Sequence, residues 1–395
     1  MKKSFFVFTF LIPLIIQAQT IKTDVLVLGN SNAAFAAGVQ ATESGVNAII
    51  LTQSDGFKLS DFKSLPQSGV TKAFEKRARK SLKLTDSVPL PEMTNQIVNA
   101  VIKNWSDSSK LLNVINNTNY YEIKRSGSGW EAKLTKEKSI KAKVLIVTDN
   151  IEKALPALKV GSLKSAETNT INYTENLYRT TIAGINGTSN YLSLYSLLIP
   201  NQENILYIKA DNLEIGQAAG ATAAYATLFK KNTCESNLKQ IQSKLLNNKL
   251  SLLPLDDVRE DDPNWLDIQK VGVTGILKAD IKNEKVFFNP EKEVTYDEIK
   301  QPIKDYYYKA QIWFDDHKNI PINLENTISM VCYVGNKAID ATKTEIEKKW
   351  KKNYRFSSKY DLKKVLTRQE FSVIVNEYLK PFDEVNVGRT GQVIR

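Results

Sequence analysis

Histidine is almost absent from this chain of 395 residues, which has a single one, His317. A Ser-His-Asp triad requires an imidazole beside its nucleophile, and a zinc site made of several histidines requires more than one. His317 lies in the polar stretch FDDHKN, behind Asp315 and Asp316, and no partner residues occur at the spacing of metal ligands. We therefore interpret this stretch as a surface turn, and we predict neither a metal site nor a histidine-based hydrolase.

Cysteine and glycine are scarce as well. The two cysteines, Cys234 and Cys332, lie far apart in the sequence. A disulfide is permitted in an exported protein, and two independent buried thiols fit the same spacing. Glycine accounts for 17 of 395 residues, below the usual share of about 7%. Few glycines are therefore left for loops that wrap a cofactor.

Long apolar runs are missing except at the start of the chain. Lys2 and Lys3 precede an apolar run over residues 5–16 and a small residue, Ala18. This pattern is typical of a secretory signal over residues 1–18. Because the run is too short to span a bilayer and no later run is long enough, we predict an exported protein, periplasmic or extracellular, without a transmembrane segment.

Positive charge is in excess, with a formal net charge of +11. Much of the excess lies between Lys337 and Lys364, for example in KKWKKNYRF. A basic face can attract polyanions such as acidic glycans or nucleic acid, and a solvated lysine surface explains the same composition. Because no array of arginine and aromatic residues and no zinc spacing occurs, we predict no nucleic-acid partner.

The stretch TDVLVLGNSNAAFAAGVQATESGVNAIILTQ, residues 23–53, has the pattern of a strand, a tight turn, a small-residue helix and a second strand. A dinucleotide-binding fold usually opens in this way. Gly29 occupies the first glycine position of the fingerprint, Ser31 the second, which admits the pyrophosphate, and Ala34 the third. Helix N-terminal amides around Ala33 and Ala34 are expected to remain available for an anion.

The second strand of this unit ends in Thr52 and Gln53. An Asp or Glu is expected near this point, where it accepts hydrogen bonds from the adenosine ribose. A neutral side chain can form only the weaker, uncharged bond, about half as strong as the charge-assisted one.

Further along the chain, strand patterns alternate with helical patterns. Val101 and Trp105 share one face of a predicted helix, and YYEIKRSGSGWEAKLT is a hairpin pattern. KAKVLIVTDN and ILYIKA are predicted strands, and a helix is predicted to begin near Gly216. Residues 54–90 are interpreted as loop and short helix, and residues 151–190 as irregular. The alternation predicts an α/β fold with a mainly parallel sheet.

The composition changes after about residue 250, where buried-strand runs end. The sequence then indicates a helix, a glycine turn, a short hairpin and a helix, and Phe371 and Leu379 lie on one stripe of a late helix. We predict one domain over residues 19–253 and a smaller, mostly helical domain over residues 254–395, with the linker at Pro254–Pro263.

Several blocks together resemble the secreted FAD-dependent oxidoreductase family of bacteria, loosely called xanthan-lyase-like. They are DVLVLGNSNAAFAAGVQA, KVLIVTD, LYSLLIPNQENILYIKADN with IGQAAGATAAYA, and the final LTRQEFSVIVNEYLKPF. The resemblance implies a Rossmann-like FAD/NAD(P)-binding fold, FAD as a possible cofactor and a small molecule or sugar as a possible substrate. It also implies cofactor contacts at Gly29, Ser31, Ala33, Ala34, Thr52, Gln53, Gly216, Gln217 and Ala218.

Residues 258–303 resemble an S-layer-homology-like repeat, and Leu366–Glu370 matches a second copy. Such repeats are associated with the binding of cell-wall glycans. A purely architectural helix, with Arg368 in a local salt bridge, explains the second copy equally well.

Departures from the family pattern leave two functions open. Thr148, Asp149 and Asn150 replace the expected Ala-Thr-Gly turn, the ribose position lacks its acid, and no catalytic acid or base has a matched partner. One hypothesis is an exported FAD-dependent oxidoreductase whose cofactor site is degenerate. The other is a non-enzymatic descendant, a pseudoenzyme that serves as a scaffold for a cell-surface glycan or a protein partner.

Overall fold

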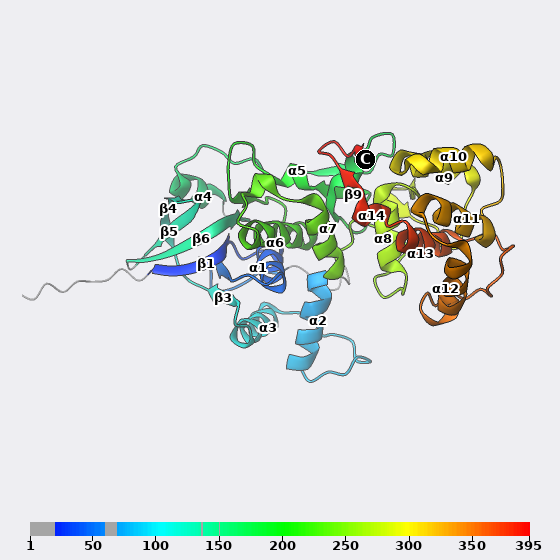
Figure 1. The fold of residues 1–395 in the computed structure, drawn as a ribbon. Helices are drawn as coiled ribbons and strands as arrows, with labels where there is room; N and C mark the ends of the chain where they lie inside the picture. Colours follow the sequence, from blue (N-terminus) through cyan, green and yellow to red (C-terminus); the bar gives the residue numbers. More distant parts are fainter. Residues whose placement is uncertain (1–19, 60–68, 136, 150) are drawn as a thin grey trace, which may run out of the picture.

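The computed structural model describes residues 20–59, 69–135, 137–149 and 151–395, so the predicted secretory signal lies outside the described residues. An α/β part lies beside a mostly helical part, and the helical part contains most of the C-terminal third of the chain (Figure 1). Among the described residues, no helix combines the length and the apolar character needed to cross a membrane.

The α/β part opens with the predicted strand-helix-strand unit. β1 (Thr20–Leu28) leads into α1 (Asn32–Glu43), and β2 (Ala48–Leu51) returns parallel to β1. Alanine and glycine dominate α1, so other elements can pack closely against most of its surface, and almost the whole helix is buried.

The central sheet has seven strands in the order β3-β2-β1-β6-β5-β4, and β10 pairs with the free part of β6. The remaining strands are β3 (Leu112–Ile115), β4 (Tyr120–Ser126), β5 (Gly129–Leu134), β6 (Lys138–Val147) and β10 (Ile205–Tyr207). The pairs β1–β2, β2–β3, β1–β6 and β6–β10 are parallel, and β4–β5–β6 form an antiparallel meander. The predicted α/β fold with a mainly parallel sheet is confirmed.

Alternate residues of β1 point into two different cores. Val25 and Val27 pack on the side covered by α1 and α6 (Leu213–Leu228), whereas Leu26 and Leu28 pack on the side of the meander and α4 (Ile151–Leu158). Burial on both faces explains why β1 is a nearly continuous apolar run instead of an alternating one.

The other helices of this part are α2 (Gly69–Ser81), α3 (Asn95–Ser108), α4 (Ile151–Leu158), α5 (Leu194–Leu197), α6 (Leu213–Leu228) and α7 (Leu238–Asn247), with 3-10 turns η1 (Leu177–Thr180) and η2 (Thr233–Glu235). Of these helices, α3, α4 and α6 contact the central sheet, and α2, α5 and α7 lie farther from it (Figure 1). Phe35 of α1 makes edge-to-face contacts with Phe57, Phe74 and Trp105, which ties α2 and α3 to the core.

The segment that we interpreted as irregular contains regular structure, whereas the described part of residues 54–90 includes the expected helix, α2, which has 13 residues. Residues 151–190 include α4 and most of a three-stranded antiparallel sheet, β7-β9-β8 (Thr168–Thr170, Asn190–Ser193, Thr181–Gly184). Strands of three or four residues are too short to show a period in the sequence, and only their pairing with one another identifies them as strands.

The C-terminal part contains α8 (Trp265–Thr274), α9 (Tyr296–Tyr306), α10 (Tyr308–Asp316), α11 (Leu324–Gly335), α12 (Ile339–Lys352), α13 (Arg368–Tyr378) and α14 (Pro381–Glu384). Two hairpins accompany them, β11 (Asp280–Lys282) with β12 (Lys285–Phe287), and β13 (Asn386–Val387) with β14 (Val393–Ile394). The predicted order of helix, glycine turn, hairpin and helix is confirmed, with Gly275 left-handed at the end of α8.

The core of the C-terminal part also takes in residues from earlier in the chain. Ile171, Tyr178 and Tyr191 belong to the same buried cluster as α8 to α13. Arg179 donates to the carbonyls of Thr274 (2.8 Å) and Gly391 (3.3 Å), so one buried side chain joins the two parts. The boundary at residue 254 stays a prediction.

Candidate functional site

The candidate site is the turn between β1 and α1, at the carboxyl edge of the parallel strands. Gly29 has φ +145°, a conformation that favours glycine. A Cβ at Gly29 would lie 2.0 Å from Thr148 Oγ1 and from Asp149 Oδ1. The glycine is therefore needed because the end of β6 packs directly against this turn.

Two aspartates bind the amides of the turn. The Asn30 amide donates to both carboxylate oxygens of Asp149, at 3.1 and 3.0 Å. The Ala33 amide donates to Asp211 Oδ1 at 3.3 Å, and Asn32 Nδ2 donates to Asp211 Oδ2 at 3.1 Å. A helix N-terminus attracts negative charge, and here the protein's own carboxylates supply it.

Ser31 has a structural partner of its own. It is the N-cap of α1, and its hydroxyl accepts from the Ala34 amide at 3.3 Å. The expectation that the amides of Ala33 and Ala34 remain available for an anion is therefore wrong, since each already donates to a side chain. Contact with FAD stays a prediction for Gly29, Ser31, Ala33 and Ala34.

The two carboxylates also act on each other. Burial raises the pKa of Asp211, the amides of Ala33 and Asn32 lower it, and the negative charge of Asp149 raises it, so the net pKa is above its ordinary value. The turn therefore already carries two interacting negative charges, and a further anion placed there would be repelled.

Thr52 and Gln53 lie at the end of β2, next to the turn. Thr52 is 2% exposed, its amide donates to the Ile115 carbonyl, and its hydroxyl accepts from the Ser54 amide at 3.0 Å. Gln53 Oε1 is buried and has no hydrogen-bond partner in the described part of the chain. The Thr52 hydroxyl is thus engaged in a local turn, and ribose contacts by these two residues stay a prediction.

The helix predicted to begin near Gly216 begins three residues earlier, at Leu213. The side chain of Asn212 accepts from the Ile215 amide at 2.8 Å and caps the helix. The Gly216 amide consequently donates to the Asn212 carbonyl (3.1 Å) within the helix. The sequence reading overlooked Asn212, although Asn is a preferred N-cap residue.

Gly216 and Gln217 lie in the contact between α6 and α1, and Ala218 is fully buried in the same core. A Cβ at Gly216 would lie 2.3 Å from the Ala33 carbonyl oxygen, so the two backbones touch. Gln217 is 3% exposed and donates to Gln40 Oε1 of α1 at 2.8 Å. The fold therefore brings α6 against the first turns of α1, and flavin contacts by these three residues stay a prediction.

As arranged, the turn does not fit the pyrophosphate of FAD. A pyrophosphate would require the amides that Asp149 and Asp211 occupy, and it would meet the charges of both carboxylates. Each hydrogen bond to a charged group contributes about 1.5–3 kcal/mol, so displacing the carboxylates would exchange one set of charged bonds for another without net gain.

Asp211 is the residue of this site that the sequence reading missed. Asp149 was identified in the sequence only as one of three residues that replace the expected Ala-Thr-Gly turn, and its contact with the Asn30 amide was not predicted. Both follow a parallel strand as the first residue of an Asp-Asn pair, Asp149 after β6 and Asp211 after β10. Because the carboxyl ends of parallel strands meet at one edge of the sheet, this repeated pair was an available signal.

His317 and the cysteines have ordinary surroundings. His317 lies at the end of α10, stacks on Trp313 with ring centroids 4.6 Å apart, and contacts the Trp313 carbonyl. In the ranges that the structure describes, no group of three His, Cys, Asp or Glu side chains is placed to hold a metal. Cys234 is exposed and Cys332 is buried, and both are free thiols.

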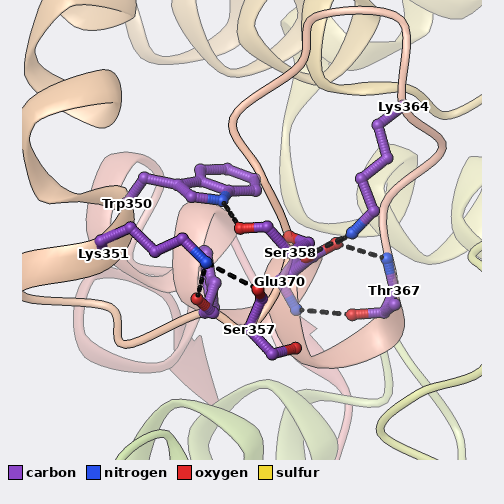
Figure 2. Close-up of polar contacts among 8 residues, drawn as sticks. Trp350, Lys351, Ser357, Ser358, Lys364, Thr367 and Glu370 are labelled. Atoms are coloured by element: carbon purple, nitrogen blue, oxygen red, sulfur yellow. Dashed lines mark hydrogen bonds and ion pairs between the residues drawn. The ribbon is translucent and has the colours of Figure 1, made fainter.

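The two segments that were interpreted as S-layer-like repeats are joined by an ion pair between Arg368 and Glu298, and the S-layer likeness itself stays a prediction. Arg368 is 3% exposed and binds Glu298 of the first copy at 2.6 Å and the Lys278 carbonyl at 2.6 Å. Figure 2 shows the neighbouring Glu370, whose carboxylate accepts from Lys364, from Ser358 and from the Thr367 amide. Arg368 is therefore in a salt bridge, although with a residue distant in the sequence, and it has an architectural role.

Comparison with known proteins yields only distant structural likeness. No protein-family model and no curated protein matches the sequence. Among solved structures, T. acidophilum thioredoxin reductase is similar at 16% identity over 32% of this chain and 35% of that chain, with a TM-score of 0.22. The flavin-dependent monooxygenase PieE, in complex with FAD and substrate, is similar at 11% identity over 38% and 34%, with a TM-score of 0.26.

The p-nitrophenol 4-monooxygenase PnpA from Pseudomonas putida is similar over more of its length, at 12% identity over 60% of this chain and 86% of that chain, with a TM-score of 0.31. The first two matches cover only about a third of the matched proteins, 35% and 34%. At these TM-scores the likeness supports no conclusion about activity, and the fold assignment rests on the strand order itself.

Proposed function

We propose that this protein is an exported, non-catalytic relative of the FAD-dependent oxidoreductases, in which the Rossmann-like fold serves as a scaffold for binding. The observation that carries the proposal is the hydrogen bonding of Asp149 and Asp211 to the amides of Asn30 and Ala33. These are the amides that would hold a pyrophosphate, and carboxylates of the same chain take its place.

The proposal also includes export from the cell and the binding of a partner at the cell surface. The pattern of residues 1–18 supports a secretory signal. The S-layer-like pattern of the C-terminal part supports a glycan as the partner, but the buried Arg368 argues that any such contact uses other residues.

The second candidate is an exported FAD-dependent oxidoreductase. The observation that favours it is the order of β6, β10 and α6, in which a helix rich in small residues follows the last parallel strand and packs on α1. FAD-dependent oxidoreductases hold FAD on this arrangement of elements. The arrangement supports a common ancestor with these enzymes more strongly than it supports FAD binding by the present protein.

A visible spectrum separates the two candidates. Protein comprising residues 19–395 is purified, its spectrum is recorded, and flavin is sought after denaturation and after incubation with added FAD. We expect a colourless protein that takes up no FAD. Flavin bound in a stoichiometric amount, before or after FAD is added, would overturn the proposal.

A gain-of-binding variant tests the physical reason. Replacing both carboxylates, Asp149→Ala with Asp211→Ala, frees the amides of Asn30 and Ala33 and removes two negative charges. We expect this variant, but not the exposed control Asp86→Asn, to bind FAD or inorganic pyrophosphate more tightly than the parent protein. Equal binding by all three, with the fold checked by circular dichroism, would show that the carboxylates do not block the turn.

A further inference from the structure

An open cavity lies away from the dinucleotide turn, where α1, α2, α6 and the end of α7 approach the segment that leads to α8. Its volume is about 440 Å³, within the range of small-molecule sites. Apolar groups of Val39, Val70 and Ala73 line part of it, and polar groups line the rest.

The polar side of this cavity is held by a buried pair of amides. Gln217 of α6 donates to Gln40 Oε1 at 2.8 Å, and Gln217 Oε1 accepts from the Val70 amide at 3.3 Å. Gly69 has φ +53°, and a Cβ there would lie 2.5 Å from Gln217 Oε1. The start of α2 is thereby fixed against α6, so this wall of the cavity is preformed.

Two further lining residues carry polar atoms without partners. The Glu260 side chain is 9% exposed, and one of its oxygens pairs with Lys72 at 2.6 Å. Its other oxygen, Oε2, is buried and has no hydrogen-bond partner among the residues that the structure describes, and the same holds for Nδ2 of Asn248. Leaving a buried polar group unsatisfied costs about 1–3 kcal/mol, more for a charged one, so a ligand that satisfies these atoms recovers that cost.

The chemistry of the lining selects the ligand. The free carboxylate oxygen requires a donor and the free amide nitrogen requires an acceptor, and a hydroxyl group offers both. The apolar wall of Val39 and Val70 suits the C–H face of a ring. Lys76 and Lys249 at the cavity carry positive charge without a carboxylate partner among the described residues.

We propose that this cavity binds a sugar unit, with Glu260 and Asn248 as its hydrogen-bonding residues. The choice of a sugar rests on the proposed role as a glycan-binding scaffold, whereas the site itself rests on the cavity and its unpartnered atoms.

Saturation-transfer NMR with glucose, N-acetylglucosamine and glucuronate tests the site on the protein of residues 19–395. We expect saturation transfer from the protein to at least one of the three sugars. Glu260→Gln and Asn248→Leu should each raise the Kd of that sugar, obtained by titrating the saturation transfer, at least tenfold, which is a change of about 1.4 kcal/mol. The control Glu203→Gln alters an exposed glutamate outside the cavity and should bind as the parent protein does. A preference for glucuronate would assign a role to Lys76 and Lys249.

A stability measurement separates a binding defect from misfolding. Because Glu260→Gln replaces a buried, half-paired carboxylate by a neutral amide, we expect it to melt no lower than the parent protein. No transfer to any of the three sugars, or equal transfer in Glu260→Gln and the parent protein, would overturn the proposal. The flavin spectrum is read independently, so a coloured protein that still loses sugar binding in Glu260→Gln would overturn only the proposed function.

Discussion

Gly216→Ala tests whether the small-residue motif of α6 serves packing against α1. Alanine favours a helix over glycine by about 1 kcal/mol, so the substitution would stabilise an unconstrained helix. Here the new Cβ would lie 2.3 Å from the Ala33 carbonyl oxygen and 2.7 Å from Ala33 Cα. These are backbone atoms, which no side-chain rotation can move.

The magnitude follows from these opposing effects. Overpacking a tight core typically costs 1–3 kcal/mol, occasionally more, and a clash between two backbones belongs at the upper end of that range. Subtracting the gain in helix propensity leaves a net loss of about 2 kcal/mol. Since 1 kcal/mol shifts the Tm by about 2–4 °C in a domain of 150–250 residues, we expect Tm to fall by about 4–8 °C.

Urea unfolding and thermal melting measure this effect, with Gly272→Ala as the matched control. Gly272 is also helical, but a Cβ there would meet the end of the Leu253 side chain at 3.0 Å, which can move. We expect the control to lie within about 1 kcal/mol of the parent protein. A Gly216→Ala protein as stable as the parent would refute the packing argument, as would an equal loss in the control.

Three further predictions concern charges and thiols. Arg368→Met breaks the buried pair with Glu298 and should lower the free energy of unfolding by about 3 kcal/mol, measured in urea; a loss below 1 kcal/mol would show that the pair is dispensable. Burial lowers the pKa of Lys239 to about 8 from 10.5, so the unfolded chain holds the proton more tightly, and stability should rise between pH 8 and 10.5. Lys239→Met should abolish that rise in denaturation curves at several pH values, and an unchanged rise would assign it to other groups. Cys234 should react with a thiol reagent in the native protein and Cys332 only after unfolding, and two fast-reacting thiols would contradict the burial of Cys332.

The parts of the fold that were predicted correctly have strong local patterns. The apolar run of β6, the glycine-containing hairpin of β4 and β5, and the stripe of Phe371 in α13 with Leu379 at its C-cap each bury their apolar groups as expected. The sheet β7-β9-β8 was missed because its strands have only three or four residues, too few to show an alternating pattern, and they are recognised as strands by their mutual pairing.

By itself, the amino-acid sequence determined the α/β architecture, the fingerprint turn at Gly29 and the missing acid at Thr52, because these depend on residue type and local period. Only the tertiary structure decided what occupies the turn. Asp149 and Asp211 are distant in sequence from Asn30 and Ala33, and they reach these amides because the ends of β6 and β10 lie at the same sheet edge as the end of β1. A hydrogen bond between such remote residues leaves no periodic trace in the chain, since strand order and register create it.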